Sequence, residues 1–175
     1  MKQLTALSLA IGVLGAIATW AFLTVGGVLI WAAFIAWGCF FHSGADDSAL
    51  RNTIVSTVFG SLVASIAALV ILAVPLADKL TLPVWAGIVV GITVWVLGFA
   101  AQIKALSVIP ANVYGYAATF AFLLQTPDRL KLSALTSLSM DNAFIAVSVS
   151  TIIGALLGYG SGKLGSALTR KVAPA

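Results

Sequence analysis

Apolar and polar positions follow one another along this chain in long blocks rather than residue by residue. Four apolar blocks are long and two are short, with polar or proline-containing stretches between them. A helix needs about 20 apolar residues to cross the roughly 30 Å of hydrocarbon in a bilayer. The pattern therefore predicts an all-α polytopic membrane protein with about six apolar helices. The blocks lie at 4–24, 28–41, 50–74, 84–102, 109–124 and 143–162.

The boundaries between blocks carry turn and capping signals. The stretch from His42 to Ser48 is polar, and its Asp or Ser side chains can cap the helix that follows. Pro75 ends one block, whereas Pro83 and Pro110 lie at helix starts, where a missing N–H costs little. The 14 residues of block 28–41 extend only about 21 Å as a helix. The two short blocks could therefore either cross the membrane or be re-entrant.

The order of long, short and long blocks occurs twice, which is what an internal duplication leaves behind. An offset of 79 residues places Gly12 on Gly91, and several other identical or similar residues also coincide. We therefore expect one transmembrane domain over 1–175, with a first repeat at 1–79, a second at 80–162 and a basic cytoplasmic tail at 163–175. Three crossings in each repeat would make the repeats inverted. The further coinciding pairs are Ile30 with Ile109, Ala32 with Ala111, Trp37 with Tyr116, and Phe41 with Phe120.

The distribution of basic residues predicts the orientation. With six crossings, six Lys and Arg side chains fall on the side of the N-terminus and three on the other; with re-entrant short blocks the count is five against four. Cytoplasmic loops are enriched in Lys and Arg. We therefore expect six crossings with both termini in the cytoplasm. The first apolar run continues past Ala18 without a polar break, which predicts a retained helix rather than a cleaved signal.

Composition agrees with a membrane location and narrows the partners. The chain is 61% hydrophobic and 8% charged, with a mean hydropathy of +1.13 and a net charge of +4, whereas soluble domains carry about 25% charged residues. The basic residues lie at the edges of apolar blocks and do not form a patch, so nucleic acid is not an expected partner. The expected partner is the lipid bilayer. Cys39 is the single cysteine and cannot form an internal disulfide.

No enzyme is expected from the chemistry of the side chains. The chain has one histidine, one cysteine and no glutamate, so neither a metal cluster nor a nucleophile–base pair can be assembled within it, and no cofactor is predicted. His42 beside Asp46 and Asp47 suits a solvated loop better than a metal-binding rim. No charged residue lies in the middle of a block, which argues against ion-coupled transport. A passive path for a small neutral polar solute remains.

The two short blocks supply the candidate lining of such a path, because irregular backbone at membrane depth is tolerated where it is buried or borders a cavity. Phe41 opposite Phe120, and Trp37 opposite Tyr116, could form a slot for a flat solute such as urea or another amide. The alternative is that these rings anchor and pack the helices. A buried Asn112 would need a partner. The candidate pore-lining residues are Trp31, Trp37, Phe41, Pro110, Asn112, Tyr116, Thr119 and Phe120.

Small residues recur at intervals of four and predict close helix packing. Examples are Gly60 with Ala64, Gly87 with Gly91, and Gly154 with Gly158. A bundle this small has more such surface than it can bury alone, which predicts a homo-oligomer such as a trimer. A different function uses the same surfaces: a non-transporting membrane subunit that packs with or regulates another membrane protein.

Two stretches, 31–41 and 108–121, together with the six-block layout, resemble the YcdZ-like family of small bacterial inner-membrane proteins of unknown function. The family's second short segment has a Pro-Gly-x-x-x-Gly pattern and a later Ala-Thr-Phe-Ala, matched here by Pro110, Gly115 and residues 118–121. Ala111 replaces the first glycine. The resemblance implies a multi-pass protein of the bacterial inner (cytoplasmic) membrane and no particular activity. The duplicated plan is also similar to that of urea channels and aquaporins, by analogy of architecture alone.

Overall fold

The computed structural model describes residues 1–169, and within them every regular element is a helix. The prediction of an all-helical polytopic membrane protein is confirmed. Four helices are long and apolar enough to cross a membrane, and shorter apolar helices accompany them. The elements are α1 (Gln3–Val25), α2 (Ile30–His42), α3 (Asp47–Ala73), α4 (Ala77–Leu80), α5 (Leu82–Phe99), η1 (Ala100–Gln102), η2 (Lys104–Leu106), α6 (Ile109–Gln125), α7 (Leu132–Leu135) and α8 (Ala143–Leu168).

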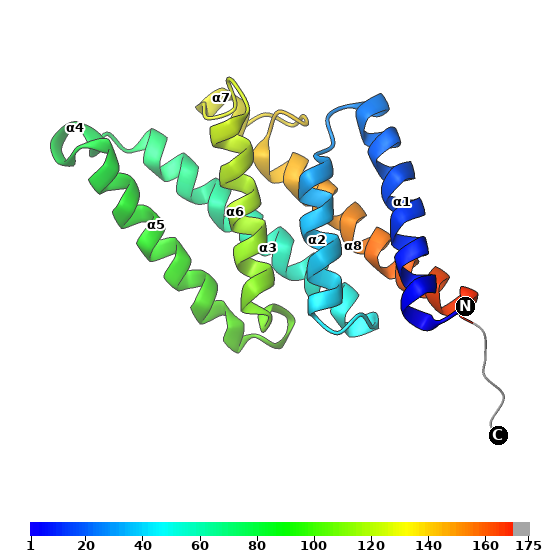
Figure 1. Ribbon diagram of the computed structural model, residues 1–175. Helices are drawn as coiled ribbons and strands as arrows, with labels where there is room; N and C mark the ends of the chain where they lie inside the picture. The colour runs from blue at the N-terminus through cyan, green and yellow to red at the C-terminus, as the bar shows by residue number, and fades with distance from the viewer. Residues whose placement is uncertain (170–175) are drawn as a thin grey trace.

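The long helices run back and forth between two ends of the bundle (Figure 1). We call one the basal end; it contains the N-terminus, the turn 43–46 and the turns 100–108. The loop end contains 26–29, 74–81 and 126–142. Although α2 has only 13 residues and spans about 20 Å, both α2 and α6 run from one end to the other as single helices (Figure 1). Neither short segment forms a re-entrant hairpin.

The bundle consists of two three-helix groups. Each group contains two helices from one half of the chain and the last long helix of the other half. In what we call the α8 group, α8 packs against α1 and α2. In the α3 group, α3 packs against α5 and α6. The groups meet where α3 crosses α8 and along the neighbouring α2 and α6 (Figure 1). The last helix of each half therefore has its main partners in the other half.

Glycines allow the helices within each group to touch through their backbones. A Cβ added at Gly60 of α3 would lie 1.9 Å from the carbonyl oxygen of Asn112 in α6. A Cβ at Gly154 of α8 would lie 2.0 Å from the carbonyl oxygen of Ala33 in α2. Asn112 follows Ala33 by 79 positions, whereas Gly154 follows Gly60 by 94. The offset of 79 therefore relates α2 to α6 but does not extend to the glycines of α3 and α8.

Three apolar clusters fill the interior. One lies within the α3 group around Val63 and Leu97, and one lies within the α8 group around Phe22 and Ala33. The third, which we call the loop-end cluster, joins the two groups: it contains Ala68, Ala118, Phe122 and Leu123 from the α3 group, Leu135 from α7, and Ala143, Ala146 and Val147 from α8.

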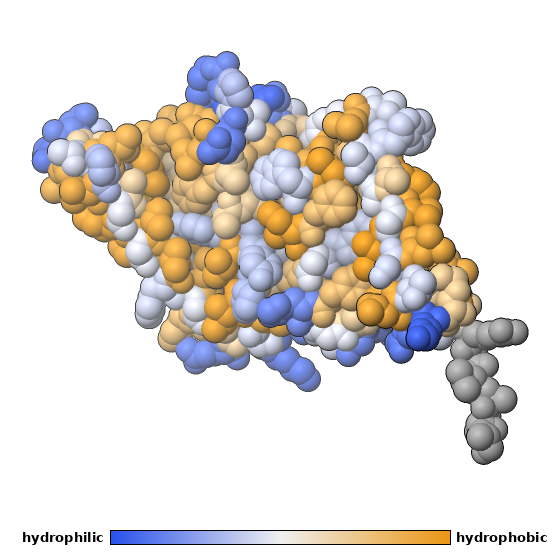
Figure 2. Space-filling model, in the orientation of Figure 1, coloured by the Kyte–Doolittle hydropathy of each residue, from blue (hydrophilic) through white to orange (hydrophobic). Residues whose placement is uncertain are grey.

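The outer helices α1 and α5 present large apolar side chains to their surroundings. Trp20 of α1 is 70% exposed and Trp95 of α5 is 65% exposed. Figure 2 shows hydrophobic residues covering the side of the bundle, with hydrophilic residues gathered near its two ends. This distribution suits a bundle whose sides contact lipid and whose ends reach water.

The helix boundaries confirm one expectation and correct another. The Asp46 side chain caps α3 by accepting a hydrogen bond from the Ala49 N–H at 2.7 Å. The basic tail was expected to begin at residue 163, but α8 continues through Lys163 to Leu168. Small residues such as Gly162 and Gly165 keep this last part packed against neighbouring helices. Arg170 and Lys171 lie outside the described residues.

Candidate functional site

Three of the predicted lining side chains make hydrogen bonds to side chains of other helices in the interior. Trp37 Nε1 donates to Ser161 Oγ across 3.0 Å, which joins α2 to α8. Thr119 Oγ1 lies 2.8 Å from Ser61 Oγ and joins α6 to α3. The Tyr116 hydroxyl lies 2.8 Å from Thr93 Oγ1 and joins α6 to α5. Each pair holds helices of the same group together.

Asn112 is fully buried near the start of α6, close to the basal end rather than at mid-depth. Its Nδ2 donates to the carbonyl oxygens of Leu97 at 3.3 Å and Leu106 at 2.9 Å. These two bonds fix the connection between α5 and α6. The Asn112 Oδ1 has no hydrogen-bond partner among the described residues.

The structure does not bring the remaining predicted residues together. Phe41 lies at the end of α2 and lines a cavity at the basal end, whereas Phe120 packs against the loop-end cluster. The expected ring slot is not formed, because α2 and α6 run in opposite directions and residues equally far from the two helix starts lie at opposite depths (Figure 1). Trp31, which is 37% exposed, and Pro110 both lie on the surface.

Buried hydroxyl groups on α3 and α8 are the interior feature that the sequence reading missed. They are costly in a hydrocarbon environment unless each finds a partner. The Oγ atoms of Ser56, Ser65 and Ser148 have none among the described residues. The signal was present in the sequence as hydroxyls spaced four apart, since Thr53, Thr57, Ser61 and Ser65 fall on one helix face. The buried set is Thr53, Ser56, Thr57, Ser61, Ser65, Ser148, Ser150, Thr151 and Ser161.

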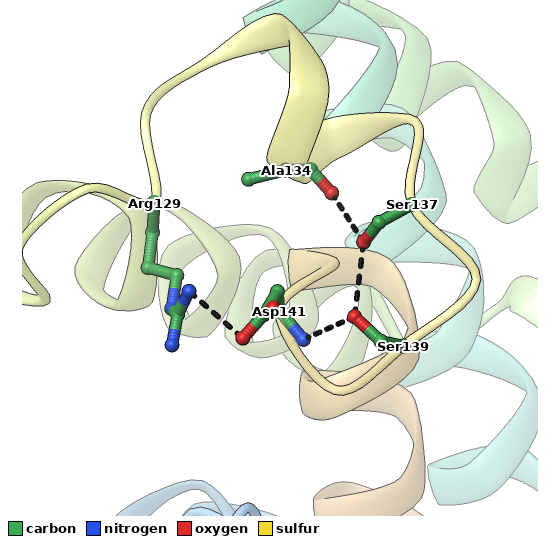
Figure 3. Close-up of polar contacts among 5 residues, drawn as sticks. All are labelled: Arg129, Ala134, Ser137, Ser139 and Asp141. Carbon is green, nitrogen blue, oxygen red and sulfur yellow. Dashed lines mark hydrogen bonds and ion pairs between the residues drawn. The ribbon is translucent and has the colours of Figure 1, made fainter.

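The connection between α6 and α8 folds over the loop end and is held by polar contacts (Figure 3). Arg129 forms a salt bridge with Asp141 at 2.8 Å, and Ser139 Oγ accepts from the Asp141 N–H at 3.2 Å. Asn142 caps α8 and donates to the carbonyl oxygens of Leu135 at 2.8 Å and Ser137 at 2.9 Å. This connection therefore places Leu135 in the loop-end cluster.

The basal end contains a cavity that is bordered by charged residues. The cavity, of about 450 Å³, lies between the start of α1, the end of α2, the turn before α3 and the end of α8. Its lining includes Gln3, Phe41, Asp46, Asp47 and Lys163. Hydrogen bonds from the Ala49 N–H and the Ser48 side chain hold the pKa of the Asp46 carboxyl below its usual value. Charged and polar groups thus meet at this cavity. A second cavity, of about 350 Å³, lies under residues 123–131 at the other end.

Comparison with known proteins places the whole bundle in one family. A family model described as "Protein of unknown function (DUF1097)" matches residues 8–166. The matched range begins within α1 and ends within α8, so it includes both three-helix groups. No curated protein and no solved structure matches the chain.

Proposed function

The chain belongs to the DUF1097 family of proteins of unknown function, and from its geometry we propose that it is a passive facilitator for a small neutral polar solute such as urea or another amide. The observation that carries the proposal is the buried hydroxyl-rich interior of α3 and α8. Several of its Oγ atoms lack partners, and no Asp, Lys or Arg is buried in residues 1–169. Such an interior offers hydrogen bonds to a neutral solute and nothing that would bind or couple to an ion.

The proposed route follows the seam, by which we mean the interface between the two groups. At the basal end the seam is polar: Thr53 Oγ1 of α3 lies 3.7 Å from Cys39 Sγ of α2. At the loop end it is closed by apolar contacts among Ala68, Leu123, Leu135 and Val147. An apolar constriction of this kind excludes water and acts as a gate in channels. Passage requires the two groups to separate at this cluster.

The seam is better suited to opening than the interior of either group. Within the groups, backbone contacts at Gly60 and Gly154 leave no room for one added carbon atom. Across the seam, the loop-end cluster consists of four larger side chains and four alanines, and contacts between side chains separate more easily than backbone contacts at glycine. A rigid-body movement of one group against the other would then open the route, as in transporters built from inverted repeats.

Stopped-flow measurement with proteoliposomes tests this function. We expect urea and formamide to enter faster than they enter empty liposomes, with glycerol and water as comparison solutes. Leu135→Ala removes side-chain volume from the gate and should raise the solute flux severalfold. If neither the wild type nor Leu135→Ala exceeds empty liposomes for any of the four solutes, transport should be abandoned as the function.

A matched variant separates gating from general loosening. Leu97→Ala removes the same atoms from a side chain that is 1% exposed and lies within the α3 group. Both truncations are expected to cost about 2–5 kcal/mol of stability. Only Leu135→Ala should increase flux, because only Leu135 lies on the seam.

We also propose that the two halves are inverted repeats in the bacterial inner membrane, with both termini cytoplasmic. In both crossings, at Gly60 and at Gly154, the last helix of one half touches the backbone of the middle helix of the other half, and this shared arrangement supports the duplication. The start of α1 and the end of α8 lie together, since Gly165 contacts Leu7. The YcdZ-like resemblance supports the location. Within residues 1–169, four Lys and Arg lie at the basal end and three at the loop end, which supports the orientation. Reporter fusions near Thr126 and at the C-terminus should report opposite sides; equal sidedness would contradict this topology.

One observation favours the rival function, a non-transporting membrane subunit, and equally supports self-association. Gly87 and Gly91 of α5 have no atom within 4 Å of an added Cβ, so this small-residue pair faces away from the bundle. Such pairs allow another helix to approach closely. We propose a homo-oligomer, such as a trimer, formed through α5. Mass measurement in detergent should show an oligomer that Gly91→Leu dissociates, whereas a stoichiometric second protein would favour the subunit function.

A further inference from the structure

The cavity at the basal end has a chemistry that the proposed transport route does not use. Its wall carries one amine, from Lys163, and two carboxylates, from Asp46 and Asp47. Leu7 and Phe41 supply apolar surface to the same cavity. A volume of about 450 Å³ lies within the range of roughly 300–1,000 Å³ that is typical of small-molecule sites.

The charges in this cavity are arranged so that they remain available to a ligand. Lys163 Nζ lies 5.0 Å from the centroid of the Tyr159 ring. Among the described residues, Lys163 forms no salt bridge with Asp46 or Asp47. One oxygen of Asp46 accepts the capping bonds from Ser48 and Ala49. The cavity therefore presents a cation on α8 and carboxylates at the start of α3.

The position of the cavity suits a lipid rather than a water-soluble molecule. The basal end is one of the two places where the apolar side of the bundle gives way to polar residues (Figure 2). Leu7 belongs to α1, whose outer side chains are exposed along the helix; Leu4, one turn earlier, is 76% exposed. A ligand with a charged head and apolar chains would place its head in the cavity and its chains along α1.

We propose that this cavity binds the headgroup of a zwitterionic phospholipid that carries a primary ammonium group, with its phosphate on Lys163 and its ammonium on Asp47. The two charge signs in one cavity match a phosphate and an amine in one headgroup. A primary ammonium has three N–H donors for carboxylate oxygens. A trimethylammonium group has no N–H donor and can make no such hydrogen bond to a carboxylate.

Native mass spectrometry of the full chain in detergent tests this site. The protein is offered equal amounts of phosphatidylethanolamine, phosphatidylcholine and phosphatidylglycerol, and the retained lipid is identified. We expect phosphatidylethanolamine to be retained preferentially. Lys163→Ala and Asp47→Asn should each reduce its retention about tenfold, the effect of losing one charge-assisted hydrogen bond.

Two matched variants control for net charge. Lys104→Ala removes a basic residue from η2 at the same end, and Asp78→Asn removes an acidic residue from α4 at the other end; neither residue lines the cavity. Both should retain the lipid as the wild type does. Thermal unfolding of all four variants establishes that they fold, so a loss of lipid can be assigned to the site.

The alternative outcomes overturn the proposal in distinguishable ways. Equal retention of phosphatidylglycerol, with no effect of Asp47→Asn, would indicate a simple basic surface. Equal retention of phosphatidylcholine would remove the requirement for a primary ammonium. Soluble phosphoethanolamine should displace the lipid only weakly; binding of the free compound as tight as that of the lipid would show that the ligand is a solute.

Discussion

The two halves of the chain differ most where each short helix connects to its long successor. Four residues, 43–46, join α2 to α3 at the basal end, whereas seventeen residues, 126–142, join α6 to α8 at the loop end. The short turn leaves a cavity of about 450 Å³ beside Phe41. The long connection inserts Leu135 into the loop-end cluster, against which Phe120 packs. The short connection therefore borders a cavity between helices, whereas the long connection contributes a side chain to an apolar cluster.

The residues that cap the helices after these two connections also differ, one being charged and the other neutral. Asp46 caps α3 with a carboxylate at the edge of the basal cavity. Asn142 caps α8 with its amide oxygen and uses its amide N–H groups to hold the carbonyl oxygens of Leu135 and Ser137. The neutral cap, Asn142, therefore also holds the segment before α8 in place, whereas the charged cap, Asp46, borders a cavity. Helix capping at one end thus also serves to close the bundle.

The largest expected effect comes from the paired glycine crossings. Gly60→Ala and Gly154→Ala each place a carbon atom about 2 Å from a carbonyl oxygen, so the two helices must move apart. We expect each variant to lose about 3 kcal/mol of stability or more, at the upper end of overpacking effects. Unfolding in mixed micelles with increasing denaturing detergent, followed by circular dichroism, measures the loss.

A third glycine provides the control for this pair. Gly12→Ala, in α1, meets no atom within 4 Å and gains up to about 1 kcal/mol in helix propensity. Similar losses at Gly60 and Gly154 would support equivalent crossings in the two groups. A large loss at one position with none at the other would break the proposed symmetry between the groups.

A smaller effect is expected from the polar pairs that hold each group together. Thr119→Val removes the bond to Ser61 in the α3 group, and Trp37→Phe removes the bond to Ser161 in the α8 group. Such bonds contribute about 0.6 kcal/mol on average and at most about 1.7 kcal/mol within membranes. The same unfolding measurement should show the two losses adding in the double variant, because the pairs belong to different groups.

Thr24 supplies the matched control for the removal of a hydroxyl. Its Oγ1 bonds only to the Trp20 carbonyl of its own helix. Thr24→Val should therefore change stability little. A loss at Thr24 as large as that at Thr119 would show that the interhelical bond adds nothing specific to the packing of the α3 group.

The smallest expected effect distinguishes the two caps by pH. Since the pKa of Asp46 is lowered in the folded protein by the Ala49 and Ser48 hydrogen bonds, its stabilising contribution is present above the unfolded carboxyl pKa of about 3.9 and disappears as the pH falls through the folded value. Asp46→Asn should flatten the loss of stability on acidification. Asp128, whose pKa is lowered by its bond to Lys131, should account for part of the remaining slope.

Substitution of Asn142, the cap of α8, provides the comparison with Asp46→Asn. Asn142 does not titrate, so Asn142→Ala should lower stability by a similar amount at every pH and loosen the connection 126–142. Limited proteolysis would detect this loosening as faster cleavage near Leu138, which is 98% exposed. An acid slope unchanged by Asp46→Asn would show that the carboxylate cap does not contribute to the pH dependence.

The sequence alone determined the class of the protein and most of its helices. A run of apolar residues must be helical to satisfy its backbone in lipid, so the long blocks predicted α1, α3, α5 and α8 to within a few residues. A cap by an Asp or Ser before α3 and the proline at the start of α6 were local signals and were predicted correctly; the structure identifies the cap as Asp46. The end of α8 was placed too early, because Lys163 was taken as a boundary although the helix continues to Leu168.

Only the tertiary structure decided which residues meet. The offset of 79 paired Phe41 with Phe120, but an alignment of two segments carries no information about depth, and antiparallel helices put the two rings at opposite ends. Trp37 bonds to Ser161 and Tyr116 bonds to Thr93, and in each pair the partner lies on another helix. In the same way, α3 and α8 pack mainly against helices of the other half of the chain. These contacts form at glycines that touch a neighbouring backbone, and the hydropathy pattern does not specify which helix that neighbour will be.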